Sequence, residues 1–461
     1  MITVPARQRI LIAIGTLICG LAIAACGPSK REQARVAAAR DTLRAAVERK
    51  TRPPYVTGDR DAHMWQETRR FYKQNDYSLV WSDGSRPRAA LDSLIKAVRA
   101  ADQDGLVPGD YGIDELTRMR ESFDPSHAAD ADLRFTFAYM RYAGDLAHGT
   151  IDPEDTDPQW HAAVRDVDLH GALAQALDAN RIEDSLRHLA PQAPQYQGLK
   201  HQLAKYRALP PNGLSAVVAA GEGKDVALTT PEAIDLIAIN MDRWRWLPDD
   251  LGSRYIIVNI PAFRLDVIED GKSVLDMKVV TGKKDSPTPV LADRMTTIVF
   301  SPYWNIPRDI VEKEIAPKAD KDPSYLEREN IEIDDSGHYR QRPGKGNSLG
   351  LVKFLFPNHY NVYLHDTPAD ALFTRVERDF SHGCVRLDQP LALAKYVLGD
   401  QPEWTEEKIT AAMSSGTEQA VALKRPLPIY LVYFTAWDEN GRLQVRKDVY
   451  GYDRRHRTAD Q

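Results

Sequence analysis

The stretch RYIIVNIPAFRLDVIEDGKSVLDMKV, residues 254–279, indicates the fold of the second half of this chain. Its apolar side chains recur at nearly every second position, which is the period of a half-buried β-strand. The dipeptide Asp270-Gly271 interrupts this pattern and is typical of a tight turn between two strands. The sequence therefore predicts consecutive strands joined by short turns.

Further short strands are expected in the same half, at residues 296–300, 361–364, 429–434 and 443–445. Many short strands with few helices predict a mainly-β domain in this half, either a compact sandwich or a partly open barrel. A charged segment at about residues 306–341 separates these strands. We expect it to be a helical or irregular capping insertion that covers a site.

The first half has the helical period instead. Leu91, Leu94, Ile95 and Val98 follow the spacing i, i+3, i+4 and i+7, which predicts core positions of an amphipathic helix. Similar stripes recur through residues 59–210, so we expect a helical domain there. Residues 27–58 contain an Ala- and Arg-rich segment that predicts a helix or a tether. The predicted fold class is therefore α+β, with helices first and strands second.

Composition excludes several classes of function. The chain has 461 residues, enough for about two or three domains. Its net charge is −6 and it has no basic patch, and both observations argue against nucleic-acid binding. No phosphate-binding loop, dinucleotide-binding glycine pattern or CxxC pair is present. The spacings of His359, His365, His382 and Cys384 match no standard metal site. We therefore expect neither a metal nor another cofactor.

The N-terminus has the features of an export signal. Arg7 and Arg9 precede an apolar run that is short for a membrane span. The run ends in Ile23-Ala24-Ala25-Cys26-Gly27, which resembles a bacterial lipoprotein signal, with residues 1–26 as the signal and Cys26 as the lipidated residue. That resemblance implies a periplasmic protein anchored by lipid to the outer membrane of a Gram-negative bacterium. A plain signal peptide and an uncleaved anchor are the alternatives.

The segment Phe380-Ser-His-Gly-Cys-Val-Arg-Leu387 holds the third of three cysteines. Since the other two, Cys19 and Cys26, belong to the signal segment, Cys384 has no partner for an intramolecular disulfide, which favours a reactive thiol. Gly383 permits a sharp turn that lets backbone N–H groups converge on one point. The adjacent His382 adds polar, potentially cationic character that favours a thiolate.

A thiol nucleophile needs a base, and His365 is the candidate. It lies 19 positions before Cys384, at the end of an apolar run that predicts a strand. A histidine at a strand end can face a cysteine in the next turn, and the carbonyl of Asp366 could orient its ring. The alternative is a buried cysteine beside two structural histidines.

These motifs are similar to those of a known family. His365-Asp-Thr-Pro368 followed by Ser381-His-Gly-Cys-Val-Arg386 resembles the signature of the YkuD-type L,D-transpeptidase catalytic domain. The resemblance extends over most of residues 230–455. In addition, residues 71–81, 104–111 and 149–153 look like the helical scaffold domain of large L,D-transpeptidases. The peptidoglycan-binding module that often follows this scaffold is not recognisable here.

The resemblance implies a cell-wall enzyme that shapes peptidoglycan. Cys384 would attack the L-centre carbonyl of diaminopimelate in a tetrapeptide donor stem and release D-Ala. His365 would act as the base, and N–H groups of Cys384, Gly383 and His382 would stabilise the oxyanion. An amine of an acceptor stem would resolve the thioester into a 3→3 cross-link. The resemblance also implies acylation by carbapenems.

Four further residues are candidates for substrate binding. Arg386 could pair with a stem carboxylate, although a structural salt bridge is an equal alternative. The aromatic residues Tyr303, Trp304 and Phe356 could line the cleft, although aromatic residues at strand ends are often core. Ser381 lacks the flanking glycines of a nucleophile elbow, which argues against a serine nucleophile.

Two other functions use the same sequence features. The acyl-thioester could pass to water, as in an L,D-carboxypeptidase, or the enzyme could act on a lipoprotein–peptidoglycan bond. The protein could also be a non-catalytic, wall-binding scaffold, which the presence of both Cys384 and His365 argues against.

Overall fold

The structure, a computed structural model, describes residues 29–156, 160, 165–210, 216–219 and 225–459. The predicted export signal, including Cys26, lies outside these residues. Within the described part of the chain, every helix is too short or too polar to cross a membrane.

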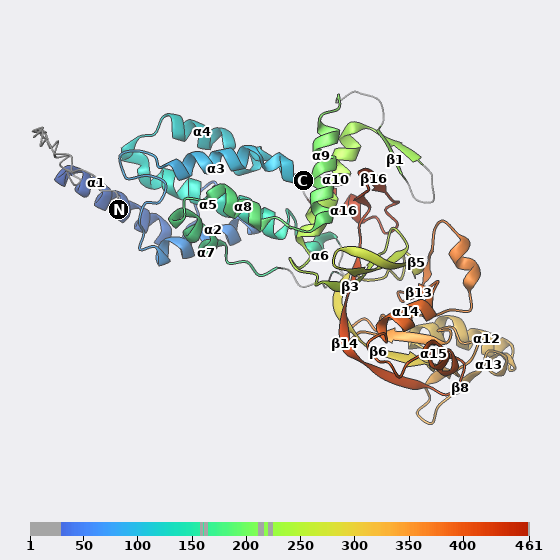
Figure 1. Ribbon diagram of the computed structural model, residues 1–461. Coiled ribbons are helices and arrows are strands. Elements are labelled where there is room, and N and C mark those ends of the chain that lie inside the picture. Colours follow the sequence, from blue (N-terminus) through green and yellow to red (C-terminus); the bar gives the residue numbers. More distant parts are fainter. Residues whose placement is uncertain (1–28, 157–159, 161–164, 211–215, 220–224, 460–461) are drawn as a thin grey trace, which may run out of the picture.

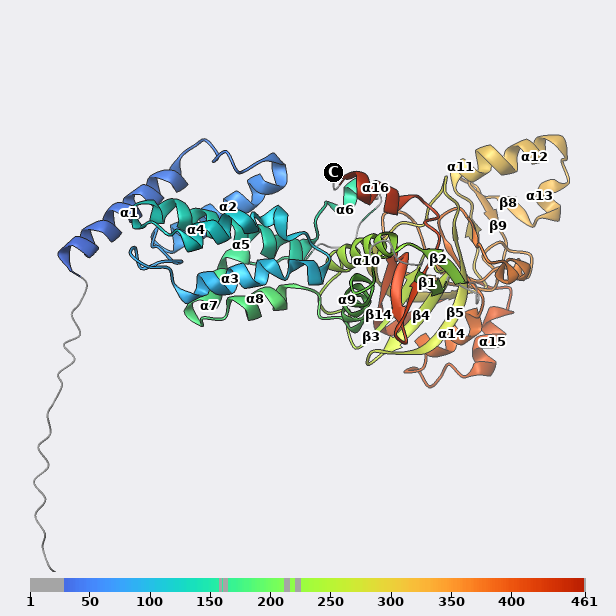
Figure 2. The same cartoon turned by 90° about the horizontal axis from the view of Figure 1, so that it is seen from above.

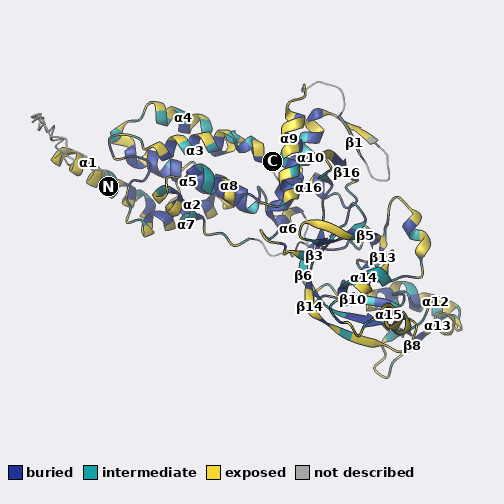
Figure 3. Ribbon diagram, in the orientation of Figure 1, coloured by how far each residue is buried: buried dark blue, intermediate teal, exposed yellow. Residues whose placement is uncertain are grey.

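The first half is a helical domain built around α5 (Ala128–His148), which is buried on nearly all sides and therefore forms the centre of the domain (Figures 1 and 3). Around it lie α1 (Lys30–Glu48), α2 (Gly58–Gln74), α3 (Ala89–Arg99), η1 (Ala101–Asp104), η2 (Pro108–Tyr111), α4 (Ile113–Glu121), η3 (Pro125–His127), α7 (Leu169–Asp178) and α8 (Ile182–Leu189). The helices α6 (Pro153–Thr156) and α9 (Pro194–Arg207) lie farther from α5, where this half meets the second half (Figure 2).

The Ala- and Arg-rich segment within residues 27–58 forms the helix α1. Its first half is exposed (Figure 3), whereas Leu43 and Val47 are fully buried in the core of the helical domain. The second half of α1 is therefore packed as part of this domain.

The second half is mainly β, as predicted. Its main sheet is formed by β3 (Arg254–Asn259), β4 (Arg264–Glu269), β5 (Lys272–Gly282), β6 (Leu291–Phe300), β10 (Val352–Leu355), β11 (Leu364–His365), β12 (Asp379–Ser381), β13 (Val385–Leu387) and β14 (Gln419–Val432). The strand order is β12-β5-β13-β11-β10-β6-β14-β3-β4, and β4 also pairs with β5. Since this pairing joins the last strand to the second one, the strands from β5 to β4 close into a ring, and β12 pairs with β5 beside it. The ring encloses one apolar core, on which α14 (Pro390–Val397) and α15 (Glu406–Met413) also pack.

A second sheet and two helices join the halves of the chain. This sheet contains β1 (Ala216–Ala219), β2 (Asp225–Leu228), β15 (Ala436–Glu439) and β16 (Arg442–Val445), in the order β15-β16-β1-β2. The helix α10 (Thr230–Arg245) begins with a capping box between Thr229 and Glu232 and packs on α9. On α10, Trp244 stacks on Phe434 at 4.7 Å between ring centroids. Figure 2 shows α9 and α10 beside the strands, near the C-terminal helix α16 (Tyr452–Ala459).

The insertion at residues 306–341 projects from the second half on the side away from the helical domain (Figure 2). It contains α11 (Arg308–Ile310), the π-helical turn η4 (Val311–Ile315), α12 (Ala316–Lys321) and α13 (Tyr325–Arg328). It also contains β8 (Ile331–Ile333) and β9 (Tyr339–Gln341), which form a small sheet with β7 (Trp304–Asn305). Because four isoleucines of this region form a core of their own, the insertion is more ordered than an irregular loop.

Candidate active site

The parallel neighbours β11 and β13 bring the predicted residues together. Cys384 immediately precedes β13, and His365, at the end of β11, lies opposite Arg386 in register. Alternate residues of a strand share one face of the sheet, so Cys384, Arg386 and His365 lie on the same face. The predicted nucleophile and base therefore belong to one surface of the ring of strands.

His365 is held as a neutral base with a defined tautomer. Its Nδ1 lies 2.5 Å from the carbonyl oxygen of Asp366. Because a carbonyl can only accept, Nδ1 carries the proton and Nε2 has the free lone pair. Burial and, to a smaller extent, the cations Arg386 and Lys353 lower the pKa of His365 to about 3. The orienting carbonyl that the sequence suggests is thus the observed partner.

Asp366 fixes the segment that follows this base. Its carboxylate accepts hydrogen bonds from the N–H groups of Leu351 and Thr367, both at 2.7 Å. Gly350 makes room for the carboxylate, since a Cβ at this position would lie 2.3 Å from Asp366 Cγ. Gly350 also has a φ of +62°, which few other residues adopt.

Cys384 is a half-buried thiol with a raised pKa. Its Sγ lies 3.8 Å from the carbonyl oxygen of Asn361 and also receives hydrogen bonds from the N–H and O–H of Tyr363. Burial raises the pKa of Cys384 to about 11, which outweighs the lowering by Tyr363 and by the charge of Arg386. The sequence-based expectation of a thiolate favoured by His382 is wrong for this state, because desolvation dominates.

No hydrogen bond joins Cys384 Sγ to the imidazole of His365 among the residues that the structure describes. Tyr363 lies next to both groups: it bonds Cys384, and its ring centroid is 5.8 Å from that of His365. A proton transfer between thiol and imidazole therefore requires a closer approach than this state shows.

The turn before Cys384 is closed by its own side chains. Gly383 has a φ of +111°, which explains the need for glycine. Ser381 Oγ accepts from the Gly383 N–H at 3.1 Å and donates to the Cys384 carbonyl at 2.5 Å. Because the Gly383 N–H is used inside the turn, it is not free for the oxyanion role that the resemblance implies.

His382 connects this turn to the insertion. Its Nε2 lies 2.8 Å from Glu314 Oε1 in η4 and 3.4 Å from Lys283 Nζ. The insertion predicted to cover a site therefore does contact the turn that carries Cys384.

The predicted aromatic residues lie in different surroundings. Phe356 is only 3% exposed and packs in the core inside the ring of strands, so its expected place in a cleft is wrong. Tyr303 is partly exposed, with its carbonyl accepting from Lys353 Nζ at 3.2 Å and its ring 4.6 Å from the Arg340 guanidinium. Trp304 belongs to β7 beside the insertion.

Sequence reasoning missed Tyr363 and Lys353 as neighbours of the site. Tyr363 precedes His365 by two positions, so the strand period places both on one face and could have identified it. Lys353 lies opposite His365 on β10, a pairing that no local pattern indicates.

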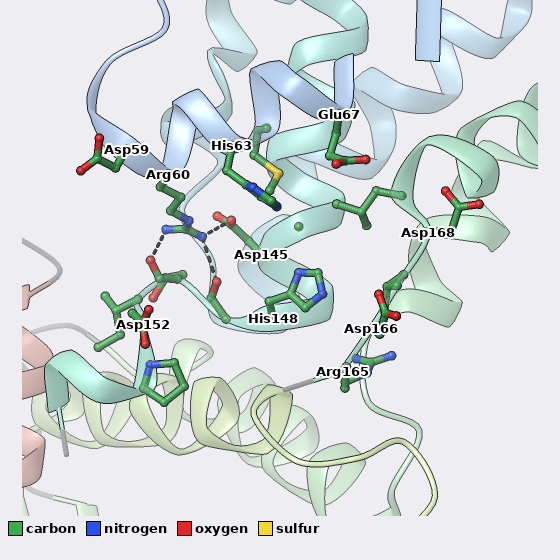
Figure 4. Close-up of a pocket in the computed structure, with 18 of the residues that line it drawn as sticks. Asp59, Arg60, His63, Glu67, Asp145, His148, Asp152, Arg165, Asp166 and Asp168 are labelled. Carbon is green, nitrogen blue, oxygen red and sulfur yellow. Dashed lines mark hydrogen bonds and ion pairs between the residues drawn. The ribbon is translucent and has the colours of Figure 1, made fainter. Parts of the chain in front are cut away.

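A cavity of about 1060 Å³ lies in the helical domain, between α2, the end of α5 and residues 149–155 and 165–170. Figure 4 shows Arg60 at its edge, bonded to the Asp145 carboxylate and to the carbonyls of Gly149 and Thr150. This arginine therefore fixes the start of the linker after α5. Among the described residues, no group of three or more His, Cys, Asp or Glu is arranged to hold a metal.

Comparisons with known proteins agree with this arrangement. A family model described as a scaffold domain matches residues 66–203, and one described as an L,D-transpeptidase catalytic domain (YkuD) matches residues 253–418. A Haemophilus influenzae protein named "Putative L,D-transpeptidase" is 34% identical over 243 residues. This alignment covers 49% of each chain, so it spans about half the length of that relative.

Solved structures give weaker similarity. An L,D-transpeptidase from Mycobacterium smegmatis is 16% identical, with 39% of this chain and 58% of that chain covered and a TM-score of 0.23. L,D-transpeptidase 3 from Mycobacterium tuberculosis, in complex with a faropenem-derived adduct, is 16% identical, with 39% and 60% covered and a TM-score of 0.21. On the two family matches, this chain belongs to the L,D-transpeptidases, with a scaffold domain before a YkuD-type catalytic domain.

Proposed function

We propose that this protein is a peptidoglycan L,D-transpeptidase that forms 3→3 cross-links. Cys384 Sγ bonds to the L-centre carbonyl carbon of diaminopimelate in a tetrapeptide stem while His365 Nε2 takes the thiol proton. The carbonyl electron pair moves to oxygen and returns as the bond to D-Ala breaks, and the leaving amine takes the proton from His365. An amine of a second stem then attacks the thioester and restores the thiol.

The observation that carries this proposal is the shared sheet face of Cys384 and His365, with the imidazole Nδ1 held by a carbonyl. The same arrangement of nucleophile, base and orienting group defines cysteine acyl transfer in general. Two cations on the face, Arg386 and Lys353, suit a substrate that carries carboxylates, as peptidoglycan stems do.

Arg386 is the candidate for direct carboxylate binding. It is half-buried, and its Nε is buried without a hydrogen-bond partner in the described part of the chain. None of the ion pairs found among the described residues includes its guanidinium, so the structural salt bridge has no support. A buried cation without a counter-charge is costly, and a donor carboxylate would offset that cost.

Purified tetrapeptide muropeptides test the reaction directly. We expect cross-linked dimers and free D-Ala with the wild type, and neither with Cys384→Ala or His365→Asn. Tripeptides without dimers would show hydrolysis and contradict cross-linking. A carbapenem adduct seen by intact mass on Cys384→Ala would contradict the choice of nucleophile, and no adduct on the wild type would favour a non-catalytic scaffold.

We also propose that the protein acts in the periplasm, anchored to the outer membrane through lipidated Cys26. The basis is the signal-like sequence alone. Metabolic labelling with a fatty acid should mark the wild type but not Cys26→Ala, and outer-membrane fractions should lose the variant. An unlabelled wild type would contradict lipidation.

A further inference from the structure

Thr288, in the loop after β5, contacts the turn before Cys384 from its buried side. Its side chain is fully buried, and its Oγ1 donates to the carbonyl oxygen of Gly383 at 2.8 Å. The same Oγ1 accepts the N–H of Gly282 at 2.8 Å. A hydroxyl has one proton, and since an N–H cannot accept it, that proton is committed to Gly383.

This contact sets the orientation of the next N–H group. The structure contains no cis peptide bond in its described residues, so the bond between Gly383 and Cys384 is trans. In a trans peptide the C=O and the following N–H point in opposite directions. Because Thr288 holds the Gly383 carbonyl on its buried side, the Cys384 N–H is directed away from Thr288.

Two neighbouring backbone groups of the turn are already occupied. Ser381 Oγ accepts the Gly383 N–H and donates to the Cys384 carbonyl. For the Cys384 N–H, no acceptor is found among the described residues. It is therefore a group of this turn that is both oriented by the fold and free to donate.

Thr288 is itself held in place. Its N–H donates to Tyr450 Oη at 3.2 Å, and that hydroxyl donates to the Gly282 carbonyl at 2.6 Å. The loop is tight enough that a Cβ on Gly282 would lie 2.6 Å from Thr288 N. Tyr450, near the C-terminus, thus braces a loop about 165 residues earlier in the chain.

We propose that Thr288 is a positioning residue that aims the Cys384 N–H at the oxyanion formed during acyl transfer. The inference rests on the proposed reaction at Cys384. As the S–C bond forms, the carbonyl electron pair moves to oxygen, and the Cys384 N–H donates to that charge. An N–H that is already oriented stabilises the charge without reorganisation, which is the usual basis of an oxyanion hole.

The test compares two reactions of the same thiol. Acylation by a carbapenem passes through an oxyanion, whereas alkylation by iodoacetamide displaces iodide and forms none. Thr288→Val keeps the shape and removes the hydroxyl, and Thr288→Ser retains the hydroxyl. We expect Thr288→Val to slow acylation by about 10- to 100-fold, up to the effect of losing an oxyanion donor. Alkylation should stay within about twofold, and Thr288→Ser should restore most of the acylation rate.

Equal slowing of both reactions would show a displaced thiol and overturn the inference, as would acylation of Thr288→Val at the wild-type rate. If Thr288→Val does not fold, Tyr450→Phe takes its place with the same two readouts, and a larger loss in acylation than in alkylation is again required. Failure of the proposed function looks different: the wild type would not be acylated, or Cys384→Ala would be.

Discussion

Cys384 in the free enzyme is expected to be a neutral thiol beside a neutral imidazole. Burial raises the pKa of the thiol to about 11 and lowers the pKa of His365 to about 3. In many cysteine enzymes the order is reversed and a thiolate is paired with a cationic histidine. Raising the pH in the absence of substrate should therefore activate Cys384 steeply.

The size of the effect follows from the thiolate fraction. At pH 7 a thiol with a pKa of about 11 is roughly 0.01% ionised, against about 3% for an ordinary cysteine of pKa 8.5. This roughly 300-fold deficit is partly offset because the more basic thiolate is about 10- to 20-fold more nucleophilic. We therefore expect alkylation of Cys384 at pH 7 to be about 20-fold slower than that of free cysteine.

Iodoacetamide alkylation followed by intact mass between pH 6 and 9.5 measures this directly, with Cys384→Ala as the blank. The rate should rise about tenfold per pH unit throughout, since the range lies below the pKa. Arg386→Gln should be slower at each pH, because the Arg386 cation lowers the pKa of Cys384. A rate that levels off between pH 6 and 8 would show a thiolate–imidazolium pair and refute this account.

Two further predictions concern the supports of the site and of the helical domain. Gly350→Ala should reduce kcat at least tenfold and lower the melting temperature by several degrees, since its Cβ would overlap Asp366. As a control, Gly271→Ala, at φ +76° with open space around it, should leave kcat unchanged. Equal losses of kcat in both variants would assign the effect to backbone strain. Burial raises the pKa of Asp132 to about 6, so the folded state holds its proton more tightly than the unfolded state. Its contribution to the free energy of unfolding should thus increase by about 2 kcal/mol as the pH falls from 7 to 4. Denaturant melts of Asp132→Asn should lack this increase in the free energy of unfolding between pH 7 and 4. The same pH dependence in the variant as in the wild type would contradict the prediction.

The local patterns of the sequence predict much of the fold. The turn Asp270-Gly271 joins β4 to β5 as expected, because a hairpin depends on neighbouring residues alone. The helical stripe with Leu91 and Val98 is α3, and both residues are fully buried. Helices and hairpins of this kind are encoded within a dozen positions, which is the range that a periodicity argument covers.

Contacts between distant segments could not be predicted in this way. The strands β1 and β2 lie in a Gly- and Ala-rich stretch and pair with each other. In addition, Ala219 of β1 pairs with Gln444 of β16, a residue more than 200 positions away, and no local pattern indicates this contact. The same applies to Phe356, whose position at a strand end does not reveal that its side chain faces the core inside the ring.

The candidate site shows the same division. The His365 and Cys384 motifs could be read from the sequence because the residue types alone indicate the chemistry. The raised pKa of Cys384 could not, since it depends on burial, which outweighs the lowering by Tyr363. The occupied N–H of Gly383 likewise depends on the rotamer of Ser381.

Electrostatics on this face connect substrate binding to base strength. Arg386 lowers the pKa of His365, and it has no counter-ion among the described residues. A donor carboxylate bound to Arg386 would offset this charge and raise the basicity of His365, while excluding water around the thiol. The same carboxylate would also remove the lowering of the Cys384 pKa by Arg386. Substrate binding at Arg386 would therefore make His365 a stronger base and the thiol a weaker acid, so it acts on both partners of the proton transfer.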